Sequence, residues 1–302
     1  MRVMRDDVLP PRKTDELIIR LPNWIGDTLM TFPMLMSLQK SGVDFSCLGH
    51  SWTKDLFSGT DFNIVADPEI KNPRWCFNFY KQNNFRQGML CTNTFPTVVP
   101  MRLAGLKPVG YHMLASNRLN YDNSLHTVEN YFELGRFFTK NKIKVEEISE
   151  TIPISERNIE IGKKLVSEKI GTDYIVICPY ATNLHKGKNK EWPYWQEFCK
   201  KIKKYNVVAL VSNDDLERCK HEFPDINILS CGLALTAYIM QNAKVVLAND
   251  SGPMHIASFF GAKVIGLLGV TEIKKTRPWH GEYLIGEDDG FISADKLLEK
   301  FY

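Results

Sequence analysis

The chain has 302 residues, a formal net charge of +3 and a hydrophobic content of 44%. A chain of this length usually exceeds one hydrophobic core, so we expect two domains of about 150 residues each. The small net charge argues against a general nucleic-acid-binding protein, and no apolar run approaches the roughly 20 residues of a membrane-spanning helix.

The predicted elements begin after a charged N-terminal segment. This segment is too charged for a signal peptide, and we expect residues 1–14 to form a loose extension of a protein that stays in the cytoplasm. Strands and helices then alternate, which predicts a parallel sheet. The predicted strands are 16–22, 43–49, 64–66, 89–92 and 109–111, and the longer helices are 28–42 and 126–140.

Asp27 stands at the turn between the first predicted strand and the first predicted helix. Ligands of open α/β sheets bind at the carboxyl ends of strands, so a carboxylate here could take a proton from an incoming hydroxyl. Partial burial against Trp24 and Ile25 would raise its pKa and favour that role. The simpler alternative is that Asp27 caps a helix that begins at Thr28.

The segment from Lys71 to Arg118 contains seven Lys or Arg residues and no Asp or Glu, with aromatic residues interleaved. Such a segment suits a polyanionic acceptor or an anionic lipid surface, where each basic residue contributes about 1 kcal/mol. The alternative is chance clustering, with the aromatic residues in the core. The candidate acceptor-binding residues are Arg74, Arg86, Arg102 and Arg118.

Residues 141–155 have mixed charge and no helical periodicity, which is typical of a linker. The alternation then restarts, so we predict an α/β protein of two doubly wound, Rossmann-like domains that face a cleft, with residues 1–150 in one and 151–302 in the other. The predicted strands of the second half are 172–180, 206–212 and 226–230, and the helices are 156–170, 192–205, 233–243, a short one from 214 and a last one at 293–302.

A polar loop, YATNLHKGKNKE, follows the first predicted strand of the second half at residues 180–191. Loops at this place commonly hold phosphates, and a lysine can neutralise a departing diphosphate without a metal. For any single lysine of the loop, a solvated side chain is the simpler interpretation. The basic residues are His185, Lys186, Lys188 and Lys190.

Residues 244–269 predict a strand, a tight polar turn, a helix and a second strand. The turn is formed by Asn249, Asp250, Ser251 and Gly252, Pro253 suits the first helical position, and His255 lies in the first helical turn. Free N–H groups and the helix dipole favour an anion such as phosphate at this point. Alone, Asp250 or Ser251 would more often be an N-cap, and a lone histidine is more often a packed side chain.

Metal and redox chemistry have little support in the sequence. The seven cysteines stand singly, so we expect them to be reduced, and no DxD, HExxH or Cys/His ligand spacing occurs. No GxGxxG follows the first strand, which weakens a nicotinamide dehydrogenase as an alternative. We therefore expect no cofactor and no metal.

Three segments together resemble the ADP-heptose:lipopolysaccharide heptosyltransferases of glycosyltransferase family 9. They are LPNWIGDTLMTFPML at 21–35, KEWPYW at 190–195 and NDSGPMHIASFFGAKVIGLLGVTEIKKTRPW at 249–279, and the third is the most specific. NTF at 93–95 and VGYH at 109–112 extend the resemblance over most of residues 16–280.

The resemblance implies a GT-B fold with an N-terminal acceptor domain and a C-terminal donor domain. It also implies inverting, metal-independent transfer from ADP-L-glycero-D-manno-heptose to the lipopolysaccharide inner core, on lipid A-Kdo or an already heptosylated acceptor. The enzyme would then touch the cytoplasmic face of the inner membrane as a peripheral protein. The basic segment would face the phosphates and acidic sugars of that acceptor, which we infer from its charge.

The resemblance assigns roles to single residues. Asp27 matches the catalytic base and Lys190 the lysine that binds the donor diphosphate. Thr182 resembles a phosphate-contacting hydroxyl. The donor-binding turn is matched by Asp250, Ser251, Gly252 and His255.

Three departures from the family pattern leave the donor open. Tyr180 replaces a glycine after the strand, Val270 replaces a common proline, and the loop to Lys190 is about three residues longer than is usual for such a connection. A tyrosine at that point blocks the close backbone approach that glycine allows. The alternatives are a relative with another nucleotide sugar or glycan acceptor, and a catalytically silent nucleotide-sugar-binding protein.

Overall fold

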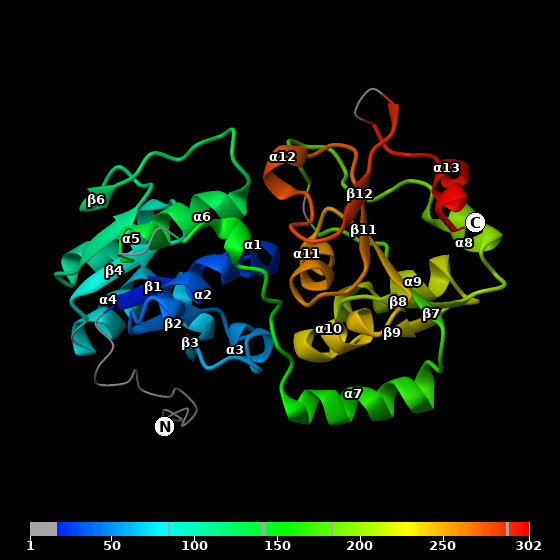
Figure 1. Cartoon of the computed structure of the whole chain (residues 1–302), viewed down its shortest axis with the longest axis horizontal. Helices are drawn as coiled ribbons and strands as arrows, with labels where there is room; N and C mark the ends of the chain where they lie inside the picture. The colour runs from blue at the N-terminus through cyan, green and yellow to red at the C-terminus, as the bar shows by residue number, and fades with distance from the viewer. Residues whose placement is uncertain (1–16, 84, 140–142, 183, 288–289, 302) are drawn as a thin grey trace. The chain divides into compact units, whose positions relative to one another are not determined.

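The computed structural model describes residues 17–83, 85–139, 143–182, 184–287 and 290–301. The chain forms two compact units, Met1–Glu150 and Thr151–Tyr302 (Figure 1). Each unit contains a six-stranded sheet in which every strand pair is parallel, with helices between the strands. The predicted α/β architecture of two Rossmann-like domains is therefore confirmed, while residues 1–14, expected to form a loose extension, lie outside the described residues.

The sheet of the first unit has the strand order β3-β2-β1-β4-β5-β6. Its central strand β1 is buried along its whole length, because helices cover a parallel sheet on both faces. In its register, Ile18 pairs with Ser46 on one side and with Gly88 on the other. The strands are β1 Leu17–Arg20, β2 Phe45–Gly49, β3 Asn63–Ala66, β4 Gln87–Leu90, β5 Lys107–Gly110 and β6 Asn117–Arg118.

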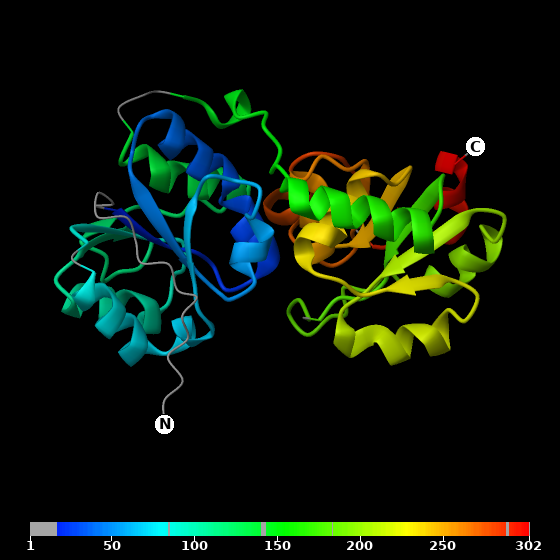
Figure 2. The same ribbon diagram turned by 90° about the horizontal axis from the view of Figure 1, so that it is seen from below.

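The helices of the first unit pack in two groups, α2 against α6 and α4 against α5, on opposite sides of the sheet (Figure 2). Apolar side chains from α4, α5 and the sheet form one core cluster, which includes Phe79, Tyr80 and Phe85. The helices are α1 Ile25–Met30, α2 Phe32–Lys40, α3 Thr53–Leu56, α4 Pro73–Gln82, α5 Phe95–Leu103 and α6 Thr127–Arg136, with short 3-10 helices η1 Pro68–Lys71 and η2 Val145–Glu147.

The single helix predicted over residues 28–42 is wrong in its start and in its continuity. The first helical residue is Ile25, with Trp24 as N-cap, and α1 ends before Thr31. A second helix starts at Phe32 with Pro33 in its first turn, where the missing N–H of proline breaks no helical hydrogen bond. Asp27 therefore lies inside the first turn of α1 and is not the N-cap.

The sheet of the second unit has the order β12-β11-β10-β7-β8-β9. One core cluster packs against it and combines the buried Trp192, Trp195 and Phe198 with Leu297 from the last helix. That helix, whose position the sequence leaves open, packs against α8. The strands are β7 Tyr174–Cys178, β8 Asn206–Leu210, β9 Asn227–Leu229, β10 Val245–Asn249, β11 Val264–Leu267 and β12 Glu282–Leu284.

The other helices of the second unit include α7 and α10, which pack closely against each other. Gly162 of α7 makes this approach possible, since a Cβ atom there would lie 2.2 Å from the ring of Tyr238. The helices are α7 Glu156–Lys169, α8 Trp195–Lys201, α9 Leu216–Glu222, α10 Leu233–Gln241, α11 Gly252–Phe259, α12 Ile273–Thr276 and α13 Ala294–Leu298, with short 3-10 helices η3 Asn213–Asp215 and η5 Glu299–Phe301.

Both sheets share one topology, because each unit starts at a central strand and adds later strands on both sides. The strand order reverses between β1 and β4 in the first unit and between β7 and β10 in the second. Ligands of such sheets bind at the carboxyl ends of the strands at this switch point. The loops after β1, β7 and β10 are therefore the places to look for function.

The cysteines are free and mostly inside the two units. Six of them are buried, and the seventh, Cys231, is half-buried. Burial raises the pKa of the Cys91 and Cys199 thiols to about 12. In the part of the chain that the structure describes, no helix is long and apolar enough to cross a membrane.

Candidate functional site

The turn after β10 holds two buried polar side chains next to each other. Asn249 ends the strand at 0% exposure and Asp250 follows at 5%. Asp250 accepts a hydrogen bond from the Thr276 hydroxyl at 2.7 Å, which fixes its carboxylate. Ser251 occupies the N-cap position of α11 but makes no capping hydrogen bond with its side chain. Capping therefore does not account for Asp250 and Ser251, and the first N–H groups of α11, which begins at Gly252, lie beside them.

His255 lies in the first turns of α11 and is 4% exposed. Its Nε2 atom is 4.0 Å from Oδ1 of Asp250, and among the described residues its buried Nδ1 atom has no hydrogen-bond partner. Burial lowers the pKa of His255, the charge of Asp250 opposes this, and the charge of Lys190 lowers the pKa further. The imidazole is therefore neutral at physiological pH.

The loop after β7 contains a tight hairpin. His185 and Lys188 exchange two backbone hydrogen bonds of 2.9 Å, and both central residues, Lys186 and Gly187, have positive φ angles. This is the geometry of a type I′ turn. The side chain of Lys186 reaches Glu272 at 3.0 Å. The hairpin thus directs two of the predicted lysines to the surface, where Lys186 and Lys188 are exposed.

Lys190 differs from these lysines. It is half-buried, and its charge acts on the buried His255, so it shares its surroundings with the turn after β10. Thr182, in the same loop, is exposed. The loop of Lys190 therefore lies beside the turn that carries Asp250, because the Trp192 N–H bonds to Asn249 at 2.8 Å, and Thr182 is exposed in the same loop.

Asn249 joins the two loops. Its Oδ1 atom accepts hydrogen bonds from the Trp192 backbone at 2.8 Å and from the Trp195 indole at 3.2 Å. Its Nδ2 atom donates to the carbonyl of Cys178 at the end of β7 at 3.3 Å. Because Trp192 follows Lys190 by two residues, Asn249 ties the lysine's backbone to the turn that carries Asp250.

Several residues of this site escaped the sequence analysis. Asn249 and Glu191 stand inside recognisable motifs, so their place next to Asp250 and Lys190 was an available signal. Thr276 also stands inside the motif at 249–279, whereas Arg218 of α9 lies outside every motif and had no signal.

Asp27 is half-buried at the switch point of the first unit. The expected partial burial against Trp24 and Ile25 stays a prediction; Trp24 is 57% exposed and Ile25 is half-buried. A buried neighbour is Tyr131 of α6, whose pKa is raised by burial and by the charge of Asp27. The half-buried carboxylate is thus close enough to the buried Tyr131 for its charge to act on the phenol.

Arg20 ends β1 and is 1% exposed. Its guanidinium donates to Asn23 Oδ1 at 2.7 Å, to the Ile70 carbonyl at 3.2 Å and to the Leu21 carbonyl. Burial lowers the pKa of this arginine. These bonds fix the loop that leads from β1 to Asp27.

The basic residues of the segment 71–118 are all exposed, whereas three of its interleaved aromatic residues, Phe79, Tyr80 and Phe85, belong to the core. Arg74 lies in the first turn of α4 and Arg118 ends β6, which places both toward the carboxyl edge of the sheet. Arg86 precedes β4, and Arg102 lies in the last turn of α5 and donates to Ser116 at 2.6 Å, so both lie toward the amino edge. The structure therefore does not bring the four arginines together.

No group of three or more His, Cys, Asp and Glu residues within the described ranges is arranged to hold a metal ion. The positive groups at the site of the second unit are instead Lys190 and the amino end of α11. This combination suits a phosphate or diphosphate.

The neutral state of His255 predicts a pH dependence of stability. The unfolded chain takes up this proton more readily than the folded protein does, because the folded pKa is the lower one. The stability that neutral His255 provides is therefore complete above about pH 6.5 and is lost as the pH falls toward the folded pKa. When the pH is lowered from 7.5 to 5.5, the free energy of unfolding, measured in urea, should fall less in His255→Gln than in the unsubstituted protein. Equal decreases in the two proteins would contradict this.

Known proteins share this architecture. The family model of glycosyltransferase family 9 (heptosyltransferase) matches residues 100–286. A lipooligosaccharide heptosyltransferase 2 of Campylobacter jejuni is 20% identical over 88% of this chain and 85% of its own length.

Two solved structures from E. coli share the fold. ADP-heptose lps heptosyltransferase II is 19% identical, with a TM-score of 0.77 over 95% of this chain and 97% of its own. Heptosyltransferase WaaC with ADP is 14% identical, with a TM-score of 0.69 over 94% and 98%. At these identities the structures show the fold, and the family model, which covers more than half of the chain, shows the family. The chain is a glycosyltransferase and belongs to glycosyltransferase family 9, the heptosyltransferases.

Proposed function

We propose that this glycosyltransferase moves heptose from ADP-L-glycero-D-manno-heptose to the inner core of lipopolysaccharide, with inversion and without a metal. The observation that carries the proposal is the grouping of Lys190, Asp250 and His255 at the amino end of α11. The donor is suggested by relatives whose names contain ADP-heptose or ADP. Residues 151–302 would bind this donor, and residues 1–150 the acceptor.

In the proposed reaction, the acceptor hydroxyl attacks the anomeric carbon from the face opposite ADP. The new bond joins the acceptor oxygen to that carbon, the bond from the carbon to the diphosphate oxygen breaks, and the proton passes to the carboxylate of Asp27. Lys190 and the N–H groups at the start of α11, beside Ser251 and Gly252, stabilise the charge on the leaving ADP. Thr182 adds a hydroxyl within the same loop.

The acceptor, lipid A-Kdo or a heptosylated core, carries phosphates and acidic sugars. Arg74 and Arg118 are the exposed arginines on the same edge of the sheet as Asp27, which supports them as its contacts, while Arg86 and Arg102 lie at the other edge. We extend the proposal to peripheral contact of this basic unit with the cytoplasmic face of the inner membrane. Co-sedimentation with vesicles that contain anionic lipid, but not with neutral vesicles, would support that contact.

The test of the function is release of ADP by the purified protein from ADP-heptose and heptose-deficient lipopolysaccharide, with and without EDTA. We expect release that depends on the acceptor and is unchanged by the chelator, and a product with the opposite anomeric configuration by NMR. If the protein turns over only another nucleotide sugar, the proposed donor is wrong and that sugar is the donor. ADP-heptose binding without turnover on several truncated acceptors would indicate a silent binding protein.

A further inference from the structure

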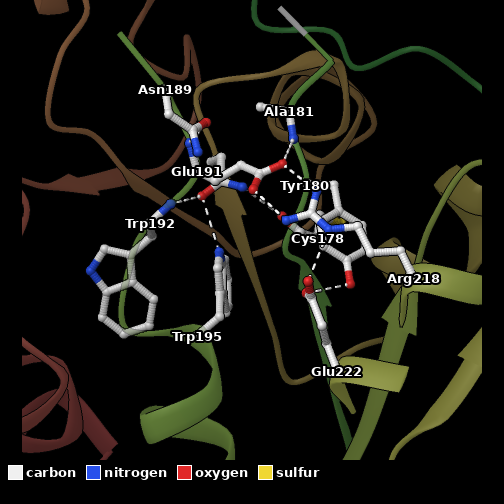
Figure 3. Close-up of polar contacts among 10 residues, drawn as sticks. Cys178, Tyr180, Ala181, Asn189, Glu191, Trp192, Trp195, Arg218 and Glu222 are labelled. Carbon is white, nitrogen blue, oxygen red and sulfur yellow. Dashed lines mark hydrogen bonds and ion pairs between the residues drawn. The ribbon is translucent and has the colours of Figure 1, made fainter. Parts of the chain in front are cut away.

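Arg218 of α9 lies outside every motif that resembles the family, yet it contacts the loop that carries Lys190. Its Nη1 and Nη2 atoms donate to the two carboxylate oxygens of Glu191 at 2.9 and 2.8 Å, and its Nε donates to Glu222 at 3.0 Å (Figure 3). A bidentate pair of this kind fixes direction as well as distance. The three donors thus bind two carboxylates from different parts of the second unit.

Tyr180 completes this cluster. The guanidinium of Arg218 lies 4.2 Å from the centre of the Tyr180 ring, and the Tyr180 hydroxyl donates to Glu222 at 2.9 Å. The ring is 9% exposed, so it packs against α9. The tyrosine that replaces the expected glycine is therefore a bound partner of Arg218. We call Tyr180, Glu191, Arg218 and Glu222 the loop clamp.

Glu191 closes the base of the loop. Its Oε1 atom accepts a hydrogen bond from the backbone N–H of Ala181 at 3.3 Å, which joins the two ends of residues 181–191. Its own N–H donates to the side chain of Asn189 at 3.0 Å. The Glu191 side chain is only 14% exposed. Burial raises the pKa of Glu191, but the bonds from Arg218 and Ala181 outweigh this and hold the pKa below its usual value. Glu191 is therefore a fixed carboxylate at the end of the loop.

Lys190 lies between these fixed neighbours. On its amino side, the Asn189 side chain accepts a hydrogen bond from the Glu191 backbone. On its carboxyl side, Glu191 is bound by Arg218, and the Trp192 backbone donates to Asn249. A long lysine side chain loses rotational freedom when it binds, and a backbone already fixed in the binding orientation reduces the cost. The loop clamp therefore limits the positions that the Lys190 ammonium group can reach.

We propose that Arg218 is a positioning residue for the donor: through its pair with Glu191 it holds Lys190 in the orientation that binds the diphosphate of the nucleotide sugar. The inference rests on the proposed function, since that function assigns the diphosphate to Lys190. It adds a residue from α9 that contacts no reacting atom. It also assigns a role to Tyr180, whose ring packs against the guanidinium of Arg218.

The test compares Arg218→Ala with the unsubstituted full-length protein. Without ligand, hydrogen exchange of the peptide that spans residues 181–191 should become about tenfold faster, because the loop loses its anchor. ADP should bind about tenfold more weakly by calorimetry, and KM for the donor should rise by a similar factor with kcat changed by less than about threefold.

Two further variants separate positioning from general stability. Lys220→Ala, which removes an exposed ion pair with Glu217 on the same helix, should leave exchange, ADP affinity and KM unchanged. Arg218→Lys keeps the charge but loses the bidentate geometry, so it should restore part of the ADP affinity. If Arg218→Ala does not melt cooperatively, Arg218→Lys and Tyr180→Phe carry the test, each with a smaller shift in the same direction.

The outcomes distinguish the inference from the function it rests on. ADP binding that Arg218→Ala and Arg218→Lys leave unchanged would overturn the inference alone. A failure of the unsubstituted protein to bind ADP would overturn the proposed donor and, with it, the inference. Weaker ADP binding with unchanged loop exchange would also overturn the inference, because Arg218 would then act on the nucleotide and not through the loop.

Discussion

Asp27→Asn is expected to lower kcat for heptosyl transfer by about 10²- to 10⁴-fold, the usual contribution of a general base. Asparagine keeps the size of the side chain but cannot accept the acceptor's proton. The half-buried position of Asp27 beside Tyr131 supports this role, since water competes less well there for the proton. The measurement is acceptor-dependent ADP release at saturating donor and acceptor.

The control for Asp27 is Asp44→Asn, an exposed aspartate of the same unit. It should leave kcat unchanged. Asp27→Asn should also keep the affinity for ADP, because the proposed donor site lies in the other unit, and the midpoint of thermal unfolding, because asparagine keeps the size of the side chain. If Asp27→Asn retains most of its kcat, another group takes the proton and the proposed base is wrong.

Lys190→Ala is expected to lower kcat/KM for the donor by about 10²- to 10³-fold, which is typical when one preorganised group that stabilises a developing negative charge is removed. Under the proposed function the N–H groups of α11 would still bind the diphosphate, so some activity should persist. The measurement is the initial rate of ADP release as a function of ADP-heptose concentration.

Lys188→Ala is the matched control for this experiment. Lys188 belongs to the same loop, two residues earlier, but its side chain is exposed and directed to the surface by the hairpin. Its replacement should change kcat/KM little. Equal losses in the two variants would mean that the loop attracts the donor through its total charge, which would contradict a specific role for Lys190.

The strands were largely predictable because they are short apolar runs between turn residues. β1, β2, β7, β8 and β10 all have this pattern, and burial on both faces of a parallel sheet demands it. β12 was not predicted, since its three residues are exposed or half-buried at the edge of the sheet and show no apolar run.

Two helices of the first unit were also missed. α5 contains Pro100, which cannot donate the helical hydrogen bond, so its sequence argues against a helix that packing nevertheless stabilises. α4 did have a signal: Asn72 caps it, and the buried Cys76, Phe79 and Tyr80 recur at helical spacing. In α4 the helical periodicity was overlooked because the segment stood out for its basic residues.

The residues of the proposed donor site follow from motifs, but the contacts that hold them do not. Glu191 and Arg218 are 27 positions apart, and no spacing rule pairs a loop residue with a helix so distant in the chain. The start of α1 was misplaced for a local reason, because Trp24 is not a favoured N-cap residue and Asp27 is.

The burial of the cysteines makes the protein suitable for fluorescent labelling. Thiol reagents attack exposed thiolates, whereas six native thiols are buried and burial raises the pKa of several of them. Cysteines introduced at two exposed lysines, Lys54 in α3 and Lys163 in α7, would therefore carry a dye pair over a low background. Energy transfer between the dyes would test whether the distance between the two labelled units changes when a nucleotide sugar is added, with every native cysteine still in place.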